Sequence, residues 1–504
     1  ISVQMADVSD GSEDGVMLFK TNVAGTFAER MRISGGNVGI GTSSPSKRVH
    51  LHASNDSASL RLENTANDKV FDITPSKPGV ANSGLSIHNV TDDRIDLHVD
   101  NSGNIIIGSS GGTLQTATAG TSNFRAGVNA GNSIQSGGNF NTVLGDEAGT
   151  AITTGDDNVA VGYAAGDAMT TGSYNAIVGK NSGGAITTGV ENVSVGWNSL
   201  DALTEGGQNV ALGASALGSD TLGSRSVAVG YQALTTQNFT TATDAHNTAV
   251  GYKAGEAVTT GANNTIIGAN TGIALTSGSN NNLIGGLAGD ALTTGHSNNI
   301  MGVSCGTALT DADYNVAIGQ QALNSDTLGS QTVAIGSFAL SAQNYTTATN
   351  SLNTAVGYAA GAAINGSAAG AGDQNTLIGG LTGDALTIGR RNAAIGVVAL
   401  SADTAGSLSV AMGYGALNAQ NFSTATDTYN TAIGPLAGAA VTTGKMNTFM
   451  GGNTGYFVTT GKVNTFIGTA VGPACTIGTH NTGVGGGEIG VSPGALDGVT
   501  EGDN

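Results

Sequence analysis

Charge, aromatic side chains and long apolar runs are all scarce in this 504-residue chain. Only 11% of the residues are charged and 4% are aromatic, with a single Trp, whereas globular enzymes carry more of both. No apolar run approaches the roughly 20 residues that a membrane-spanning helix needs. The net charge of −19 argues against nucleic acid as a partner, since phosphate contacts require Lys and Arg. We therefore expect a chain without a membrane span, without a nucleic-acid partner and without the composition of an enzyme.

Glycine is abundant instead, with 81 residues, and much of it closes one repeated motif. The motif is typified by Asn158-Val159-Ala160-Val161-Gly162, and its closing glycine is a marker for each copy. Successive markers are 17 residues apart, except for three steps of 21 and one of 22, and they fall at 145, 162, 179, 196, 213, 230, 251, 268, 285, 302, 319, 336, 357, 379, 396, 413, 434, 451, 468 and 485. A fixed period of this size, repeated this often, indicates a solenoid.

Each coil of this solenoid is expected to contain two short strands and two turns. The residue before the marker glycine is Val, Ile, Leu or Met in all twenty copies, so we assign the Val161-type row to the coil interior. Alternate strand residues face opposite sides, which places the Ala160-type row on the other face. That row is small or apolar and includes Phe449 and Phe466, so it is predicted to pack against a partner subunit. The second strand is expected within residues 165–172.

The Asn that opens the motif is present in seventeen of the twenty copies, the exceptions being Ser226, Thr332 and Ser409. Stacked Asn side chains form hydrogen-bonded ladders, and a column of so many equal copies favours a structural role over a catalytic one. The expected fold is therefore an all-β solenoid (β-roll or β-helix) of about twenty 17-residue coils.

Three domains are expected. Residues 1–116 carry nine of the seventeen Lys and Arg and contain alternating strand patterns, which predicts small β-rich fibre modules for attachment or as a shaft. Residues 117–485 form the solenoid, in which residues 123–127 are expected to be an irregular capping coil. Residues 486–504 form an acidic C-terminal tail.

Three coils carry a four-residue insertion, and each insertion follows a recurring Asp: Asp220, Asp326 or Asp403. Insertions in solenoids usually project as loops on one face. Each loop has one aromatic residue amid Gln, Asn and Thr, and these aromatics are Phe239, Tyr345 and Phe422. Two interpretations remain open: the loops contact a receptor through an aromatic anchor, or they clasp adjacent subunits with the aromatic buried.

Other candidates for chemistry favour structure. His50 and His52 form a His-x-His pair with metal-ligand chemistry, but an ordinary strand location is preferred. Cys305 and Cys475 lie nine coil steps apart and are expected to be unpaired core residues. A discontinuous aromatic row directly follows marker glycines and is expected either to stack on sugars or to pack at the coil edge or against a neighbouring subunit. It comprises Tyr163, Trp197, Tyr231, Tyr252, Tyr358 and Tyr414. Carboxylates such as Asp167 appear singly, so no catalytic, metal or cofactor site is predicted.

Two parts of the sequence resemble known families. The segment 29–33, followed by 36–45 and 49–51, resembles a module common in bacteriophage tail fibres. The Asn-x-Ala-Val-Gly coils resemble repeats in fibre proteins of marine phages and are similar to the β-roll head of trimeric autotransporter adhesins. Together these resemblances cover residues 30–45 and 123–485. They imply a parallel, fibrous homotrimer that binds a cell surface.

The expected function is therefore that of a virion tail fibre which contacts other virion proteins and a host-surface glycan or protein. The alternative is a cellular trimeric adhesin located outside the cell or on its surface. A third hypothesis is an ice-binding solenoid, because the Thr-Thr-Gly column, as in Thr170-Thr171-Gly172, would form a threonine ladder.

Overall fold

The computed structural model describes residues 2–5, 15–51, 60–64, 69–74, 85–89, 94–99, 105–107, 118–366, 370–472 and 475–486. The chain divides into two compact units, Ile1–Gln115 and Thr116–Asn504. All regular structure in the described residues is β, and none of those residues belongs to a helix that could cross a membrane. The predicted all-β class is confirmed.

The first unit contains two five-stranded sheets. One has the order β1-β2-β3-β4-β5, and its strands are β1 (Ser2–Met5), β2 (Gly15–Val23), β3 (Thr26–Ser34), β4 (Asn37–Ile40) and β5 (Val49–Leu51). The other has the order β10-β9-β8-β7-β6, and its strands are β6 (Leu60–Asn64), β7 (Lys69–Thr74), β8 (Leu85–Asn89), β9 (Arg94–Val99) and β10 (Ile105–Ile107). The segment that resembles a tail-fibre module forms β3, the following turn, β4 and β5. Its Glu29 and Arg32 make a bidentate ion pair at 2.7 and 2.8 Å.

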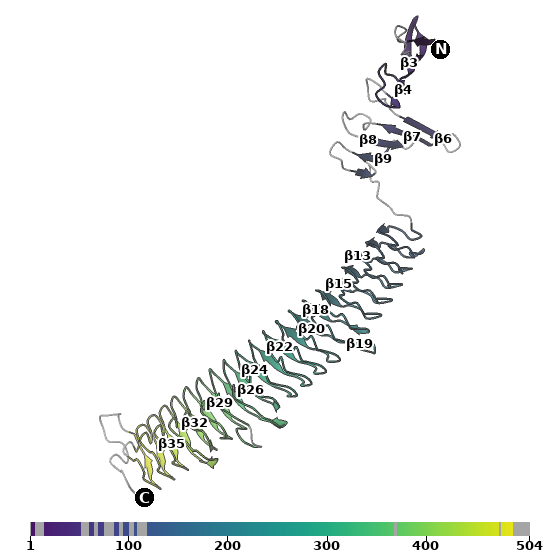
Figure 1. The fold of residues 1–504 in the computed structure, drawn as a ribbon. Coiled ribbons are helices and arrows are strands. Elements are labelled where there is room, and N and C mark those ends of the chain that lie inside the picture. Colours follow the sequence, from purple (N-terminus) through teal and green to yellow (C-terminus); the bar gives the residue numbers. More distant parts are fainter. Residues whose placement is uncertain are drawn as a thin grey trace. The chain divides into compact units, whose positions relative to one another are not determined.

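The second unit is the solenoid, and its strands stack side by side into one parallel 21-stranded sheet (Figure 1). The strands of this sheet are β11 (Phe124–Ala126), β12 (Thr142–Leu144), β13 (Val159–Val161), β14 (Ala176–Val178), β15 (Val193–Val195), β16 (Val210–Leu212), β18 (Val227–Val229), β20 (Thr248–Val250), β21 (Thr265–Ile267), β22 (Asn282–Ile284), β23 (Asn299–Met301), β24 (Val316–Ile318), β26 (Val333–Ile335), β28 (Thr354–Val356), β29 (Thr376–Ile378), β30 (Ala393–Ile395), β32 (Val410–Met412), β34 (Thr431–Ile433), β35 (Thr448–Met450), β36 (Thr465–Ile467) and β37 (Thr482–Val484). The predicted solenoid of 17-residue coils is confirmed. Residues 123–127 differ from the expected irregular cap, because β11 pairs in regular register with β12.

Most coils have one strand and not the two that were predicted. The segment 165–172 forms turns whose backbone still bonds along the stack, as in Thr170 N–H to the Thr187 carbonyl at 2.9 Å. Within this segment Gly166 has φ 57°, a left-handed conformation that an extended strand does not contain. The corner that precedes the segment, at Gly162, also requires glycine. Gly162 has φ 133°, and a Cβ there would lie 2.5 Å from the Gly179 carbonyl oxygen of the next coil. A side chain at this corner would therefore collide with backbone.

Among the described residues of the solenoid, extra strand pairs occur in the three specialised blocks and in no other coil. There, two-residue strands pair in parallel beside the main sheet: β17 (Gly223–Ser224) with β19 (Thr243–Asp244), β25 (Gly329–Ser330) with β27 (Thr349–Asn350), and β31 (Gly406–Ser407) with β33 (Thr426–Asp427).

The two faces of the main sheet are the reverse of those predicted. The middle residue of each strand, the Ala160-type row, points into the coil, where Ala160, Phe449 and Phe466 are fully buried. The residue before the marker glycine, the Val161-type row, points outward. Ile267 and Ile318 of that row, for example, are 37% and 36% exposed. The prediction of a partner subunit against the Ala160-type row is therefore wrong, because that row fills the interior of its own chain.

Complementary side-chain volumes inside the coil explain why the Ala160-type row points inward. In seven coils a fully buried Leu lies six residues after the middle strand residue, and that strand residue is then Ala or Ser. These pairs are Ser194 with Leu200, Ala211 with Leu217, Ala228 with Leu234, Ala317 with Leu323, Ala334 with Leu340, Ala394 with Leu400, and Ala411 with Leu417. Where the strand residue is Phe, the opposing position is Gly. A Cβ on Gly455 would lie 2.5 Å from the Phe449 ring. The narrow interior therefore accepts one large side chain at this level and not two.

The Asn column forms the predicted ladder. Asn158 is fully buried, and its Nδ2 donates to the Gly172 carbonyl at 2.9 Å and to Asn141 Oδ1 at 3.0 Å. Its own Oδ1 accepts from the backbone N–H of Asn175 at 3.0 Å. Each Asn thus ties its coil to both neighbours and satisfies buried backbone groups, which is the structural role expected of it.

Candidate functional site

The main sheet exposes an apolar face along the whole solenoid, which we call the outward face. It consists of the Val161-type row together with the first residue of each strand, which is most often Thr or Val. The Val161-type row is aliphatic in every coil from β12 to β37 and lies at regular spacing. Soluble monomers rarely expose a continuous apolar strip of this length. The outward face is therefore the first candidate for a contact surface.

The three inserted loops are held to the coil by a buried carboxylate. In the first loop, Asp220 Oδ1 accepts from the backbone N–H of Gly223 at 3.0 Å and of Phe239 at 3.2 Å. Its Oδ2 accepts from Gln237 Nε2 at 2.5 Å, and Gln237 Oε1 accepts from Asn247 Nδ2 at 2.8 Å. The same bonds recur for Asp326 with Gln343, Tyr345 and Asn353, and for Asp403 with Gln420, Phe422 and Asn430.

This arrangement also accounts for the three gaps in the Asn column. Gln237 Nε2 reaches Ser226 Oγ at 3.1 Å, so the Gln side chain occupies space that an Asn at 226 would fill. Gln343 reaches Thr332 and Gln420 reaches Ser409 in the same way. The shorter hydroxyl residues at these positions are therefore part of the loop attachment.

The loop aromatics lie inside their own chain. Phe239, Tyr345 and Phe422 are 7%, 1% and 6% exposed, and Tyr345 Oη donates to the Gly372 carbonyl at 3.0 Å. These rings offer almost no surface to a receptor or to another subunit. Both interpretations of the loops, receptor contact and clasping of an adjacent subunit, stay predictions. They now concern the exposed polar residues of the loops and not the aromatic rings.

Burial raises the pKa of the Asp220, Asp326 and Asp403 carboxyls, although the hydrogen bonds from Gln and from the backbone act in the opposite direction. A carboxyl whose folded pKa exceeds its unfolded value stabilises the fold most below the unfolded pKa. That contribution is lost as the pH rises through the folded pKa.

Replacing all three residues by Asn is therefore expected to flatten the pH dependence of stability. In amide hydrogen exchange of the three loop coils between pH 3.5 and 7, corrected for the intrinsic pH dependence of exchange, the unmodified chain should lose protection with rising pH relative to the triple variant. The difference isolates the three carboxyls from the other titrating groups. Parallel pH profiles for the two proteins would show that these carboxyls do not carry a raised pKa.

The aromatic row after the marker glycines is exposed. Tyr163, Trp197 and Tyr358 are 54%, 54% and 59% exposed. Tyr231 and Tyr252, on successive coils, stack with ring centroids 5.6 Å apart. The row is thus accessible in the single chain, and its role in sugar stacking or subunit packing stays a prediction.

One pairing was missed in the sequence. The sequence predicts Asp167 as a single carboxylate, but Asp167 and Asp201 both lie over Gly184, since a Cβ there would be 3.6 Å from Asp167 Oδ1 and 3.0 Å from Asp201 Oδ1. Burial raises the pKa of both groups. Asp167 and Asp201 are two coil periods apart in the sequence, and the equivalent residue of the coil between them is Gly184. This spacing is the signal that predicts that the two carboxylates lie close together. They line a groove of about 530 Å³ together with Tyr163 and Lys180.

The remaining candidates are structural or lie outside the described residues. Cys305 and Cys475 are free and fully buried, and burial raises the pKa of Cys305 to about 12. This agrees with their predicted place in the core. His50 accepts from the Ser46 N–H at 3.3 Å, while His52 lies outside the described residues. No group of three or more His, Cys, Asp or Glu in the described part of the chain has the geometry to hold a metal ion.

The first threonine of each pair in the Thr-Thr-Gly column is hydrogen-bonded within the solenoid, whereas the second, as at Thr171 and Thr188, is exposed. Hydroxyl groups of Thr153, Thr170 and Thr187 donate to the carbonyl one coil further on at 3.1, 3.1 and 3.2 Å. These hydroxyls therefore bind the stack together.

The fold defines a class, the β-solenoid repeat proteins, with a 21-stranded parallel sheet and an open apolar face. Comparison with known proteins adds no closer identification: no protein-family model, no curated protein and no solved structure matches the chain.

Proposed function

We propose that this chain is a structural fibre protein of a phage virion, a tail fibre that assembles as a parallel homotrimer and attaches to the host surface. The observation that carries the proposal is the outward face, whose aliphatic row repeats in every coil of an uninterrupted sheet. Such a regular strip needs a partner with the same repeat.

A second copy of the chain in parallel orientation has that repeat. Stacked parallel strands are about 4.8 Å apart, so two solenoids of the same chain stay in register over all their coils. Burying the remaining exposed part of each outward aliphatic residue contributes on the order of 1 kcal/mol. Summed over twenty coils, this exceeds the cost of association, which is about 4–15 kcal/mol. The number three follows from the resemblance to trimeric fibres.

Sedimentation of the intact chain tests the assembly. The expected species has three times the chain mass of 49.4 kDa. A species of one chain mass, at micromolar concentration and without denaturant, would refute the homotrimer.

The alternative of a cellular trimeric adhesin shares the assembly and differs in location. Gold-labelled antibody against residues 118–366 is expected to mark the tails of virus particles. Labelling of cell envelopes instead would favour the adhesin. Thermal hysteresis of the purified chain would favour the ice-binding hypothesis.

A further inference from the structure

The solenoid is acidic along most of its length, but its C-terminal coils are not. Between Asp427 and Glu488 the sequence has no Asp or Glu, while Lys445, Lys462 and His480 fall within this stretch. In a chain with a net charge of −19, these coils form a local cationic region.

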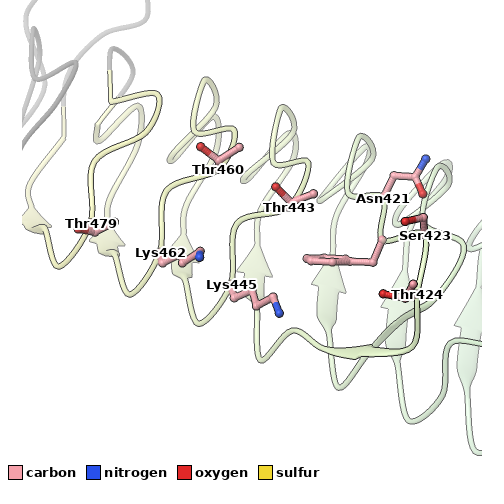
Figure 2. Close-up of a pocket in the computed structure, with 9 residues that line it drawn as sticks. Asn421, Ser423, Thr424, Thr443, Lys445, Thr460, Lys462 and Thr479 are labelled. Carbon is pink, nitrogen blue, oxygen red and sulfur yellow. The ribbon is translucent and has the colours of Figure 1, made fainter.

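Lys445 and Lys462 lie in a groove of about 660 Å³ beside the third inserted loop. Figure 2 shows the two lysines at the same position of successive coils, with Thr443 and Thr460 in a parallel row. The groove is lined by Asn421, Phe422, Ser423, Thr424, Thr443, Lys445, Thr460, Lys462 and Thr479. All of these residues belong to turns and the loop, and none is an outward residue of the main sheet. The groove is therefore formed by residues other than those of the outward face.

The two ammonium groups are available for a ligand. Lys445 Nζ lies 5.6 Å from the centroid of the Phe422 ring, which fixes its direction. Within the described residues, neither lysine has a carboxylate at ion-pair distance, whereas Arg225 and Lys253 elsewhere in the solenoid are paired with Asp244 and Glu256.

We infer that this groove binds an acidic saccharide, a short chain of sugars that carry carboxylate groups; the inference rests on the proposed attachment function and names its ligand class. Two cations one coil apart, on the order of 4.8 Å, suit carboxylates spaced along a chain. The exposed hydroxyls of Ser423, Thr424, Thr443 and Thr460 supply donors and acceptors for sugar hydroxyls. The groove volume is that of a small-molecule site and exceeds what an inorganic anion requires.

Nucleic acid fits the groove poorly. Binding of single strands needs exposed aromatic platforms and a longer basic track, but Phe422 is 6% exposed and the groove has only two lysines.

The chain contains its own control. The first inserted loop has the same neighbourhood, with Thr260 and Ser277 in place of Thr443 and Thr460, but Ala262 and Ser279 stand where the lysines stand. The first loop therefore has the hydroxyls of the groove without its charge.

Calorimetric titration of the full chain with tetragalacturonate, maltotetraose and inorganic sulfate tests the inference. We expect one tetragalacturonate per chain, with affinity that falls as salt rises, and little binding of the neutral or inorganic probe. The variant Lys445→Gln/Lys462→Gln should weaken binding by roughly tenfold or more. Its matched control, Lys180→Gln/Lys253→Gln, removes the same charge elsewhere and should bind as the unmodified chain does. The variant Ala262→Lys/Ser279→Lys should raise the stoichiometry toward two.

If tetragalacturonate does not bind, or if both Lys→Gln variants lose affinity equally, the groove is not the binding site. If sulfate binds with the same affinity as tetragalacturonate, the groove is a general anion site and the proposal of an acidic saccharide ligand is wrong. Because the groove lies within one chain, sedimentation of the same sample separates the two proposals. If a monomer binds tetragalacturonate, the groove is supported as a saccharide site and the homotrimer is refuted.

Discussion

Replacement of Asn281 by Ala is expected to open the solenoid locally, with amide hydrogen exchange in the next coil about a hundredfold faster. Asn281 is fully buried, and its Nδ2 donates to the Gly295 carbonyl at 2.9 Å and to Asn264 Oδ1 at 3.2 Å. Its Oδ1 accepts from the backbone N–H and Nδ2 of Asn298, at 2.9 and 3.1 Å. Alanine leaves these groups buried without this partner, at a cost of about 3 kcal/mol.

Hydrogen exchange is the appropriate measurement because a repeat array opens locally, so a single unfolding free energy does not describe it. The matched control is Asn282→Thr on the adjacent, exposed position of the same strand, where the preceding coil already has Thr265. That variant should change exchange little. Similar rates for the two variants would mean that the ladder does not hold the stack.

Charging the outward face is expected to separate the subunits without unfolding them. The variant Ile267→Lys/Ile318→Lys/Ile378→Lys places three charges on residues that are 37%, 36% and 38% exposed in the single chain. A buried apolar contact does not tolerate unpaired ammonium groups, so sedimentation should show monomers. The circular dichroism spectrum should be unchanged, because these side chains do not fill the coil.

The control for this variant adds the same charge away from the sheet. The variant Thr171→Lys/Thr188→Lys/Thr260→Lys changes exposed residues of the turns. It should remain assembled. If both triple variants behave alike, added charge and not the outward face determines the assembly state.

The sequence predicts the solenoid well because one chemical constraint acts in every coil. The marker glycine, as at Gly162, has a conformation and a close approach that a side chain would prevent, so the period is directly visible. The Asn ladder is equally visible because each buried amide must satisfy the same backbone groups in each coil.

The inside and outside of the sheet were assigned wrongly for a physical reason. A three-residue strand with two apolar rows has no polar side to mark the surface, so alternation alone leaves two choices. The decisive signal is that side-chain sizes at positions six residues apart vary inversely: a small residue at one position accompanies a large residue at the other. Examples are Ser194 with Leu200 and Phe449 with Gly455. Composition of a single row does not contain that information.

The loop aromatics illustrate the same limit. Phe422 stands amid Asn, Ser and Thr, a composition typical of an exposed binding loop. Its backbone N–H nevertheless donates to the buried Asp403 carboxylate, and the Phe422 ring is covered. The groove at Lys445 and Lys462 depends on residues from three separate coils beside that loop, and its lining is visible only once the coils are stacked.

A density map of the assembled, purified chain at side-chain resolution tests the outward face most directly. We expect three parallel chains, with Ile267, Ile318 and their equivalents packed against the same row of the neighbouring chains and with water excluded between them. A map in which this row faces solvent along a single chain, or in which other surfaces join the chains, would contradict the proposed fibre assembly.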